Sequence, residues 1–396
     1  MQTIQPELVG LSSSRLQRLN DVMQQYIDQK TFAGIVTLVA REGQVAHLET
    51  FGWQDKEANR PMAPDSIFRI YSMTKPITSA AVMMLVEEGK VRLSDPVSRF
   101  VPGFKDAKVL VGRGSNYDLV PAKREMLVHD LFTHSGGLSY GWDENSPVDE
   151  MYRQQVWGPR ERGEDPSLEE FCVALSKIPL AYHPGTAFRY SVSIDVLGYI
   201  VQKASGIPFD TFLQKRIFEP LGMPDTAFMV PADKLDRFAA VYGPAEGGGI
   251  KSIVDMENGR FTRPTRNPSG GGGLVSTTGD YFRFGQMLLN GGELDGTRLL
   301  GRKTVEWMLQ NHLPDGLHPM DEPANGFGLG GKVLVNPGLS HLPGSVGKFR
   351  WGGAANTEWF IDPVEKLQGL IMLQYMPAFT IPIVEDFESL VYQALE

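Results

Sequence analysis

Residues 71–76 read Tyr71-Ser72-Met73-Thr74-Lys75-Pro76 and place a serine three residues before a lysine, at the start of an apolar run. Residues 72–88 have the spacing of a helix that Gly89 ends, and side chains three apart share one helical face. The Ser72 hydroxyl and the Lys75 amine are therefore expected to meet. A serine hydroxyl attacks efficiently once a neighbouring base takes its proton, and a lysine amine is such a base. The free N–H groups at a helix start also favour negative charge on an attacked carbonyl oxygen.

A serine and a lysine at this spacing are weak evidence by themselves, because about one or two chance matches are expected in a chain of this length. A second match, Ser345 and Lys348, lies in a glycine-containing turn that leads into a strand, so its side chains would not share a helical face. The first pair is also compatible with a helix-capping serine beside a solvated lysine. The interpretation therefore depends on the rest of the chain.

Both ends of the chain predict helices and antiparallel strands. Residues 12–30 have the apolar stripe of a helix, and residues 34–40 and 45–51 predict a hairpin. Near the other end, the patterns predict strands at 330–336, 348–351, 356–362 and 367–376 and helices at 277–289 and 383–395. The middle is richer in loops and helical patterns, with helices predicted at 191–205 and 208–218.

These patterns predict an α+β fold whose antiparallel sheet is built from both termini and flanked by helices. Residues 1–94 and 271–396 would form this domain, and residues 95–270 would form an inserted, mainly helical domain. The cleft between the two domains is the predicted active site.

Three ordered motifs resemble those of the penicillin-recognising serine hydrolases, a group that includes class C β-lactamases, DD-peptidases and family VIII carboxylesterases. The first is the Ser72 to Lys75 motif with its surround, residues 65–80. The second is Phe188-Arg189-Tyr190-Ser191-Val192-Ser193, similar to the esterase form of the family's tyrosine motif, and the third is Trp351-Gly352-Gly353, where β-lactamases have Lys-Thr-Gly. Supporting matches occur at residues 131–138, 220–223 and 273–277, so the resemblance runs from about Leu11 to the C-terminus.

The resemblance implies a β-lactamase-like fold and assigns roles to the matching residues. Ser72 is implied to be the nucleophile, and Lys75 and Tyr190 are implied to take its proton and return it to the leaving alcohol. Which of these two is the formal base stays open. The backbone N–H groups of Ser72 and Ala354 are implied to form the oxyanion hole. The implied substrate-binding residues are Trp351, Gly352, Gly353 and Val192.

Two departures from the β-lactamase pattern favour an ester substrate. Trp351 stands where a lysine would bind the carboxylate of a penicillin, and it has no charge and a single N–H. Val192 stands where an asparagine would hydrogen-bond the amide of a β-lactam. A site without both groups favours a neutral acyl or alkoxy group over an anionic lactam. We therefore predict a serine esterase that hydrolyses carboxylic esters through an acyl-enzyme, with weak or no β-lactam hydrolysis and with no cofactor or metal.

Three other functions stay open. A β-lactamase or D-amino-acid peptidase would use the same acylation chemistry, and an acyltransferase of the same fold would favour an acceptor alcohol over water. A catalytically silent relative would bind peptides or self-assemble, although the intact Ser72, Lys75 and Tyr190 speak against it. The sequence makes no prediction about the natural ester or the oligomeric state.

Two short motifs and two histidines are interpreted as structural. Residues 137–141 match the G-x-S-x-G of α/β-hydrolases around Ser139, but they do not join a strand to a helix, as that motif requires. Residues 326–333 match a phosphate-binding G-x-G-x-x-G, but they lead into an apolar strand, so no helix start would face a phosphate. His129 and His134 have no third ligand at metal spacing.

Charge and composition narrow the class of partner. The 396 residues carry a formal net charge of −9 with acidic and basic residues mixed, which argues against the clustered basic face that nucleic acids need. No apolar run is long enough to span a membrane, and the first residues do not have the pattern of a signal peptide. We expect a cytoplasmic protein that binds a small-molecule ester, with neither a nucleic acid nor a membrane as partner. Its single cysteine, Cys172, is expected to be a buried core thiol.

Overall fold

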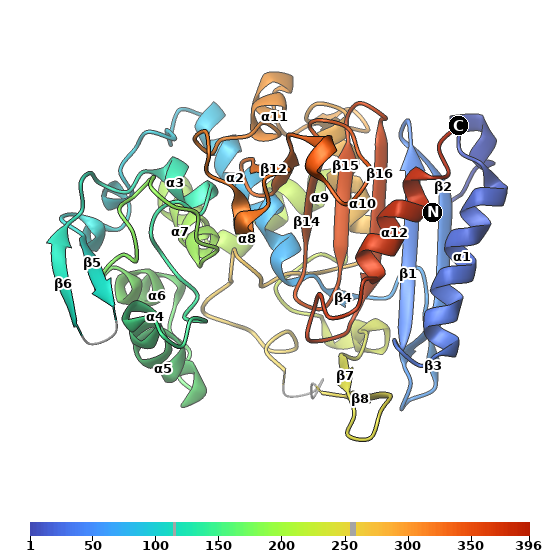
Figure 1. Ribbon diagram of the computed structural model, residues 1–396, viewed down its shortest axis with the longest axis horizontal. Helices are drawn as coiled ribbons and strands as arrows, with labels where there is room; N and C mark the ends of the chain where they lie inside the picture. Colours follow the sequence, from blue (N-terminus) through green and yellow to red (C-terminus); the bar gives the residue numbers. More distant parts are fainter. Residues whose placement is uncertain (114–115, 254–258) are drawn as a thin grey trace.

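The computed structural model describes residues 1–113, 116–253 and 259–396, and in this part of the chain an eight-stranded antiparallel sheet forms the centre (Figure 1). The strand order is β12-β13-β14-β15-β16-β1-β2-β3. These strands are β1 (Gly34–Arg41), β2 (Gln44–Asp55), β3 (Arg60–Pro61), β12 (Asn325–Phe327), β13 (Lys332–Leu334), β14 (Phe349–Gly352), β15 (Glu358–Asp362) and β16 (Leu367–Leu373). Because β1 pairs with β16, from Ile35 opposite Leu373 to Arg41 opposite Leu367, the sheet joins the two ends of the chain. The predicted α+β fold is confirmed.

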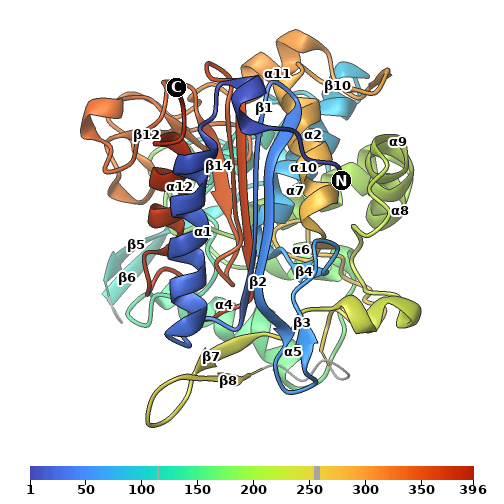
Figure 2. The same cartoon turned by 90° about the vertical axis from the view of Figure 1, so that its right-hand side faces the viewer.

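Strand β1 is buried on both faces because its side chains alternate between two apolar cores. Ile35 and Val39 belong to the core beneath α1 (Ser13–Asp28) and α12 (Ile383–Tyr392). Val36 and Leu38 belong to the core on the other face, with α2 (Thr74–Glu87) and α10 (Thr278–Leu289). Figure 2 shows the sheet nearly edge-on between these two pairs of helices. This layering holds α2, the helix that follows Ser72, against the sheet.

Helices dominate the middle of the chain, as predicted. They are α3 (Val128–Phe132), α4 (Pro147–Tyr152), α5 (Gly158–Glu161), α6 (Leu168–Leu175), α7 (Ser193–Ser205), α8 (Phe209–Leu213) and α9 (Glu219–Leu221). A further helix, α11 (Arg302–Met308), follows a small hairpin of β10 (Glu293–Leu294) and β11 (Thr297–Arg298). None of the described helices has the length and apolar character that crossing a membrane needs.

The middle of the chain also contains strands that were not predicted. One hairpin, β5 (Lys108–Arg113) with β6 (Asn116–Pro121), lies at the end of the molecule opposite α1 (Figure 1). A second hairpin joins β7 (Tyr242–Pro244) to β8 (Ile250–Ser252). The middle is therefore mainly helical but not exclusively so.

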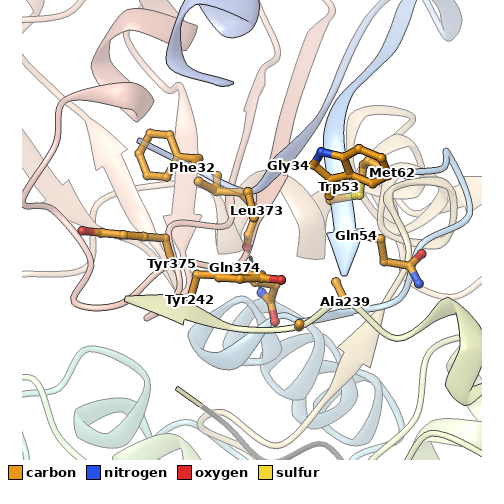
Figure 3. Close-up of a pocket in the computed structure, with 12 residues that line it drawn as sticks. Phe32, Gly34, Trp53, Gln54, Met62, Ala239, Tyr242, Leu373, Gln374 and Tyr375 are labelled. Atoms are coloured by element: carbon orange, nitrogen blue, oxygen red, sulfur yellow. Dashed lines mark hydrogen bonds between the residues drawn. The ribbon is translucent and has the colours of Figure 1, made fainter. Parts of the chain in front are cut away.

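Residues 238–242, which the sequence analysis places in the inserted domain, lie along the end of the large sheet. The backbone N–H of Ala240 donates to the Gln54 carbonyl, and Tyr242 forms a β-bridge with Tyr375. Figure 3 shows this segment beside the ends of β2 and β16, where it encloses a pocket of only about 10 Å³, room for one water. The domain boundaries at 94/95 and 270/271 stay a prediction. These boundaries do not account for residues 238–242, which return from the predicted inserted domain to the large sheet.

Candidate active site

Ser72 lies in a single 3-10 turn, Tyr71–Met73, directly before α2. The sequence predicted one continuous helix from Ser72, whereas the α-helix begins at Thr74. Tyr71 has a φ of 41°, which is a costly conformation for a residue with a side chain, and it turns the chain sharply after the short strand β4 (Phe68–Arg69). The first N–H groups of a helical segment have no partner within it, so the Ser72 N–H lies where such groups are free.

Lys75 is fully buried, and its amine nitrogen has three acceptors around it. Nζ lies 3.0 Å from Ser72 Oγ, 3.1 Å from Tyr140 Oη and 2.6 Å from the Gly271 carbonyl oxygen. These contacts use all three N–H donors of a lysine ammonium, which satisfies a buried charge that would otherwise be costly. The predicted meeting of Ser72 with Lys75 is present, and Tyr140 and Gly271 are additional partners that the sequence analysis did not identify.

Tyr190 reaches the same hydroxyl from the segment before α7. Its Oη lies 2.7 Å from Ser72 Oγ, and Lys75 Nζ lies 4.6 Å from the centre of its ring. The serine oxygen is therefore in contact with both an amine and a phenol. The structure brings together the three side chains to which the resemblance gives catalytic roles.

His134 fixes the backbone on both sides of Tyr190. Its Nδ1 accepts a hydrogen bond of 3.3 Å from the Ser191 N–H, and its carbonyl oxygen accepts one of 2.9 Å from the Arg189 N–H. The ring is fully buried, 4.8 Å from the ring of Tyr190 between centroids. Burial, together with the charge of Lys75, lowers the pKa of His134 well below its usual value. A neutral, positioning histidine agrees with the structural interpretation from the sequence.

Gly271 is held in place by Asp195, a residue of α7 that the sequence analysis did not single out. Asp195 Oδ1 accepts hydrogen bonds from the Gly271 N–H at 3.2 Å and from Ser269 Oγ at 2.5 Å. This contact directs the Gly271 carbonyl toward Lys75. A Cβ on Gly271 would lie 2.4 Å from Asp195 Oδ2, so the close approach requires a glycine.

We expect Gly271→Ala to lower kcat for an ester by about 10- to 100-fold, because the methyl group displaces the carbonyl from Lys75. Gly272→Ala is the matched control, since its Cβ would lie 3.6 Å from the Tyr71 carbonyl carbon, an ordinary contact. Its rate should stay within about threefold of the wild type. Steady-state hydrolysis gives the rates, and thermal unfolding checks that both variants fold. Equal losses in the two variants would contradict this role for the Gly271 carbonyl.

Strand β14 ends beside the Tyr71–Met73 turn and carries the third predicted motif. Gly353 approaches so closely that a Cβ there would lie 2.6 Å from the Ile70 carbonyl oxygen. Gly352 is equally constrained, since its Cβ would lie 2.0 Å from Glu358 Oε2. The backbone N–H of Ala354 follows in the next turn and donates to no acceptor within the described residues. An oxyanion hole needs such a free N–H, and the pairing of Ala354 with Ser72 stays a prediction.

Trp351 and Val192, both predicted to bind substrate, have different surroundings. Trp351 packs 5.4 Å from Tyr190 and 5.2 Å from Phe327 between ring centres, and its Nε1 has no acceptor in the part of the chain that is described. That N–H is an unused donor inside the buried aromatic cluster that Tyr190 packs against. Val192, by contrast, is completely buried in the hydrophobic core directly before α7, so its side chain is not available for substrate contact in this structure. It supports the segment that carries Tyr190 instead.

Tyr140 and Trp142 extend the aromatic surroundings of the site toward solvent. Their rings stack at 4.5 Å with 10° between the planes, and 69% of Trp142 is exposed. Burial, with Tyr190 and Asp195 nearby, raises the pKa of Tyr140 well above its usual value, which keeps this phenol neutral. Trp142 therefore offers an exposed apolar face at the site.

The segments interpreted as structural have structural partners. Ser139 is buried, donates to Asp149 Oδ1 at 2.7 Å and accepts from Arg189 Nε at 3.1 Å. Residues 326–333 lie in the hairpin of β12 and β13, with no helix at their end. Cys172 is a buried free thiol, as predicted.

Known proteins resemble this chain over most of its length. A model of the Beta-lactamase family matches residues 19–382. Protein Rv1367c of Mycobacterium tuberculosis is 36% identical over 364 residues, which cover 89% of this chain and 88% of that protein. Esterase EstB of Burkholderia gladioli is 28% identical over 386 residues, which cover 93% of each chain. Among solved structures, EstCE1, a hydrolase with promiscuous acyltransferase activity, has a TM-score of 0.81 and 26% identity, and the match covers 96% of this chain and 98% of that one.

Proposed function

Since this chain belongs to the β-lactamase family and is a serine hydrolase of that fold with esterase relatives, we propose that it is a carboxylesterase that forms an acyl-enzyme on Ser72. The observation that carries the proposal is the convergence on Ser72 Oγ of Lys75 Nζ at 3.0 Å and Tyr190 Oη at 2.7 Å. The esterase EstB and the hydrolase EstCE1 support the same reaction class.

In the proposed acylation step, Tyr190 takes the proton of Ser72 while Lys75 stays charged. Lys75 Nζ is surrounded by three acceptors, and an ammonium group that donates to all three has no lone pair for a further proton. Tyr190 Oη is the remaining side-chain atom in contact with Ser72 Oγ that can take a proton, which it does as a phenolate, and Lys75 Nζ lies 4.6 Å from the centre of its ring. Tyr190 is therefore the proposed general base, with Lys75 as the group that sustains it.

The rest of the proposed cycle moves the same proton. Ser72 Oγ bonds to the ester carbonyl carbon, and the N–H groups of Ser72 and Ala354 hold the resulting oxyanion. As the carbon–oxygen bond to the alcohol breaks, the proton on Tyr190 passes to the alcohol. A water molecule then loses its proton to Tyr190 and attacks the acyl carbon, and Ser72 leaves and regains its proton.

The proposed preference for an ester over a β-lactam is tested by comparing para-nitrophenyl butyrate with nitrocefin. The uncharged Trp351 beside Tyr190 offers no cation to a lactam carboxylate. We therefore expect kcat/KM for the ester to exceed that for nitrocefin by at least about 100-fold. Faster turnover of nitrocefin would instead identify a β-lactamase.

Covalent labelling separates the proposed enzyme from a catalytically silent relative. A fluorophosphonate should form an adduct at Ser72, located by mass spectrometry of the labelled peptide, because the reagent reacts with an activated serine. A chain that binds but does not catalyse would remain unlabelled.

A further inference from the structure

A pocket of about 440 Å³ lies between α5 and the loop of residues 260–273, a size that suits a small organic group. Its lining includes Trp157, Arg160, Arg260, Phe261, Asn267 and Gly273. The same loop contains Gly271, whose carbonyl contacts Lys75, and Gly272, whose Cβ would lie 3.6 Å from the backbone of Tyr71. One wall of the pocket is therefore built from the loop that packs directly on the Tyr71–Ser72 segment.

Arg260 connects this pocket to the nucleophile. Its Nη2 donates a hydrogen bond of 2.8 Å to the Gly272 carbonyl oxygen, and its guanidinium carbon lies 4.7 Å from the centre of the Phe261 ring. The Phe261 ring in turn meets the Tyr71 ring edge-on, 5.6 Å between centres. The guanidinium is thus held by the two groups, Gly272 and Phe261, that also touch the residue before Ser72.

Neither Arg160 nor Arg260 has a carboxylate partner among the described residues. The Arg160 guanidinium rests against two aromatic rings, 5.2 Å from Trp157 and 5.0 Å from Phe171, and makes no ion pair there. Burial lowers the pKa of both arginines, the Asp195 carboxylate opposes this effect at both, and the charge of Arg260 adds to it at Arg160. Two guanidinium groups that line one pocket and form no ion pair within the described residues offer donors to a carboxylate.

The acidic side chains around the pocket do not neutralise this charge. Glu164 pairs with Arg162 at 2.9 Å, and Asp165 Oδ2 accepts a hydrogen bond of 3.2 Å from the Arg266 N–H. Glu161 is exposed to water at the rim and contacts neither arginine in an ion pair among the described residues. Asp195, whose charge acts on both arginines, accepts hydrogen bonds from the Gly271 N–H and Ser269 Oγ and forms no ion pair with either arginine among the described residues.

Asn267 supplies an independent sign of an absent ligand. Only 7% of this residue is exposed, and neither its Nδ2 nor its Oδ1 has a hydrogen-bond partner within the described part of the chain. Buried amide groups almost always have partners, so an unsatisfied one that lines a pocket calls for a polar occupant. Its N–H₂ group is a buried donor without an acceptor beside this pocket.

We propose that the pocket binds the carboxylate of an ester that carries a second, negatively charged group, with Arg160, Arg260 and Asn267 as its ligands. This inference rests on the proposed esterase function and names its substrate class. The carboxylate can belong to the acyl side, as in a monoester of a dicarboxylic acid, or to the alcohol side, as in an ester of a hydroxy acid. It stays unreacted while Ser72 attacks the ester carbonyl. This proposal is compatible with the absence of a cation at Trp351, because the carboxylate would bind in the arginine pocket and a different part of the ester would lie beside Trp351.

Two matched pairs of esters test the proposal and distinguish the two sides. The para-nitrophenyl monoester of glutarate is compared with para-nitrophenyl pentanoate, and para-butyryloxybenzoate is compared with its methyl ester. For at least one pair, wild-type kcat/KM should be about tenfold or more higher for the anionic ester. Arg260→Gln and Arg160→Gln should each lower the ratio of kcat/KM for the anionic ester to that for its neutral partner by about tenfold, mainly through a higher KM for the anionic ester.

Arg162→Gln is the matched control, because Arg162 lies on the same segment but is not part of the pocket lining, and it should leave the preference between the two esters of each pair unchanged. Hydrolysis of the neutral esters without an anionic preference would overturn the carboxylate site and leave the esterase standing. If the arginine variants lost kcat/KM equally for the anionic and the neutral ester of a pair, the carboxylate site would also be overturned. If none of the four esters reacts and a fluorophosphonate does not label Ser72, the proposed function fails, and this inference with it. If Arg260→Gln does not fold, the preference of the wild type for the anionic esters and its loss in Arg160→Gln test the carboxylate site.

Discussion

Ser72→Ala should abolish ester hydrolysis, with kcat lower by at least about 10⁴-fold, because the variant lacks the atom that forms the acyl-enzyme. Ser72 Oγ is the atom that both Lys75 and Tyr190 contact, so an alanine leaves the amine and the phenol without a group to activate. The residue is half-buried and the change only removes an oxygen, so the fold should persist. Hydrolysis of para-nitrophenyl butyrate and labelling by a fluorophosphonate should be lost together.

Ser139→Ala is the control, since Ser139 is the serine of the competing G-x-S-x-G motif. Its hydroxyl is buried against Asp149, whose carboxylate also accepts from Arg189 Nη2 at 2.7 Å, so the charge keeps a partner in the variant. We expect activity within about tenfold of the wild type and a free energy of unfolding lower by roughly 1–3 kcal/mol. Activity that survives Ser72→Ala but not Ser139→Ala would move the nucleophile to the other motif.

The large sheet was predictable because its strands carry a strong local pattern. The apolar run of residues 34–40 fits a strand with one core on each face, and both cores are present. The hairpin of β5 and β6 has no comparable pattern of buried apolar residues, since apolar side chains such as Val111 and Leu119 remain exposed. The bridge between Tyr242 and Tyr375 joins residues far apart in the chain, and no periodicity reveals such a partner.

The same difference applies to the site: contacts between residues close in the chain were predictable, whereas contacts between distant residues were not. The contact of Ser72 with Lys75 follows from helical spacing, although the serine itself lies in the preceding 3-10 turn. Tyr190 could be assigned only through the resemblance, because nothing in its own segment indicates a distant serine.

Three further residues of the site, Tyr140, Asp195 and Gly271, were missed because tertiary packing alone brings them to Lys75 or its loop. The run of four glycines at 270–273 was the available signal, since such a run marks a close backbone approach. Val192, in contrast, was assigned to the site but does not face it. A motif places it two residues from Tyr190, but the start of α7 buries its side chain in the core.

Tyr190→Phe should lower kcat/KM for an ester by about 10²- to 10⁴-fold, the range expected when a general base is lost. Phenylalanine retains the ring that packs 5.4 Å from Trp351 and 4.8 Å from His134, so the loss is confined to one hydroxyl. Lys75 cannot simply replace it, because its three N–H groups are already directed at acceptors. The decrease should therefore lie in kcat, with KM and the thermal midpoint of unfolding little changed.

Tyr140→Phe is the comparison variant for Tyr190→Phe, because Tyr140 is expected only to accept a hydrogen bond from Lys75 and not to act as the base. Tyr140 Oη accepts from Lys75 Nζ at 3.1 Å, and its raised pKa keeps it protonated, so it is poorly suited to take a proton from serine. Its loss should cost about tenfold, the effect of one hydrogen bond to a charged group. If Tyr140→Phe were the more damaging change and Tyr190→Phe kept more than a tenth of the activity, the phenol in contact with Ser72 would not be the base. The proton would then have to pass to Lys75, which can accept it only as a neutral amine, after losing one of its own N–H protons.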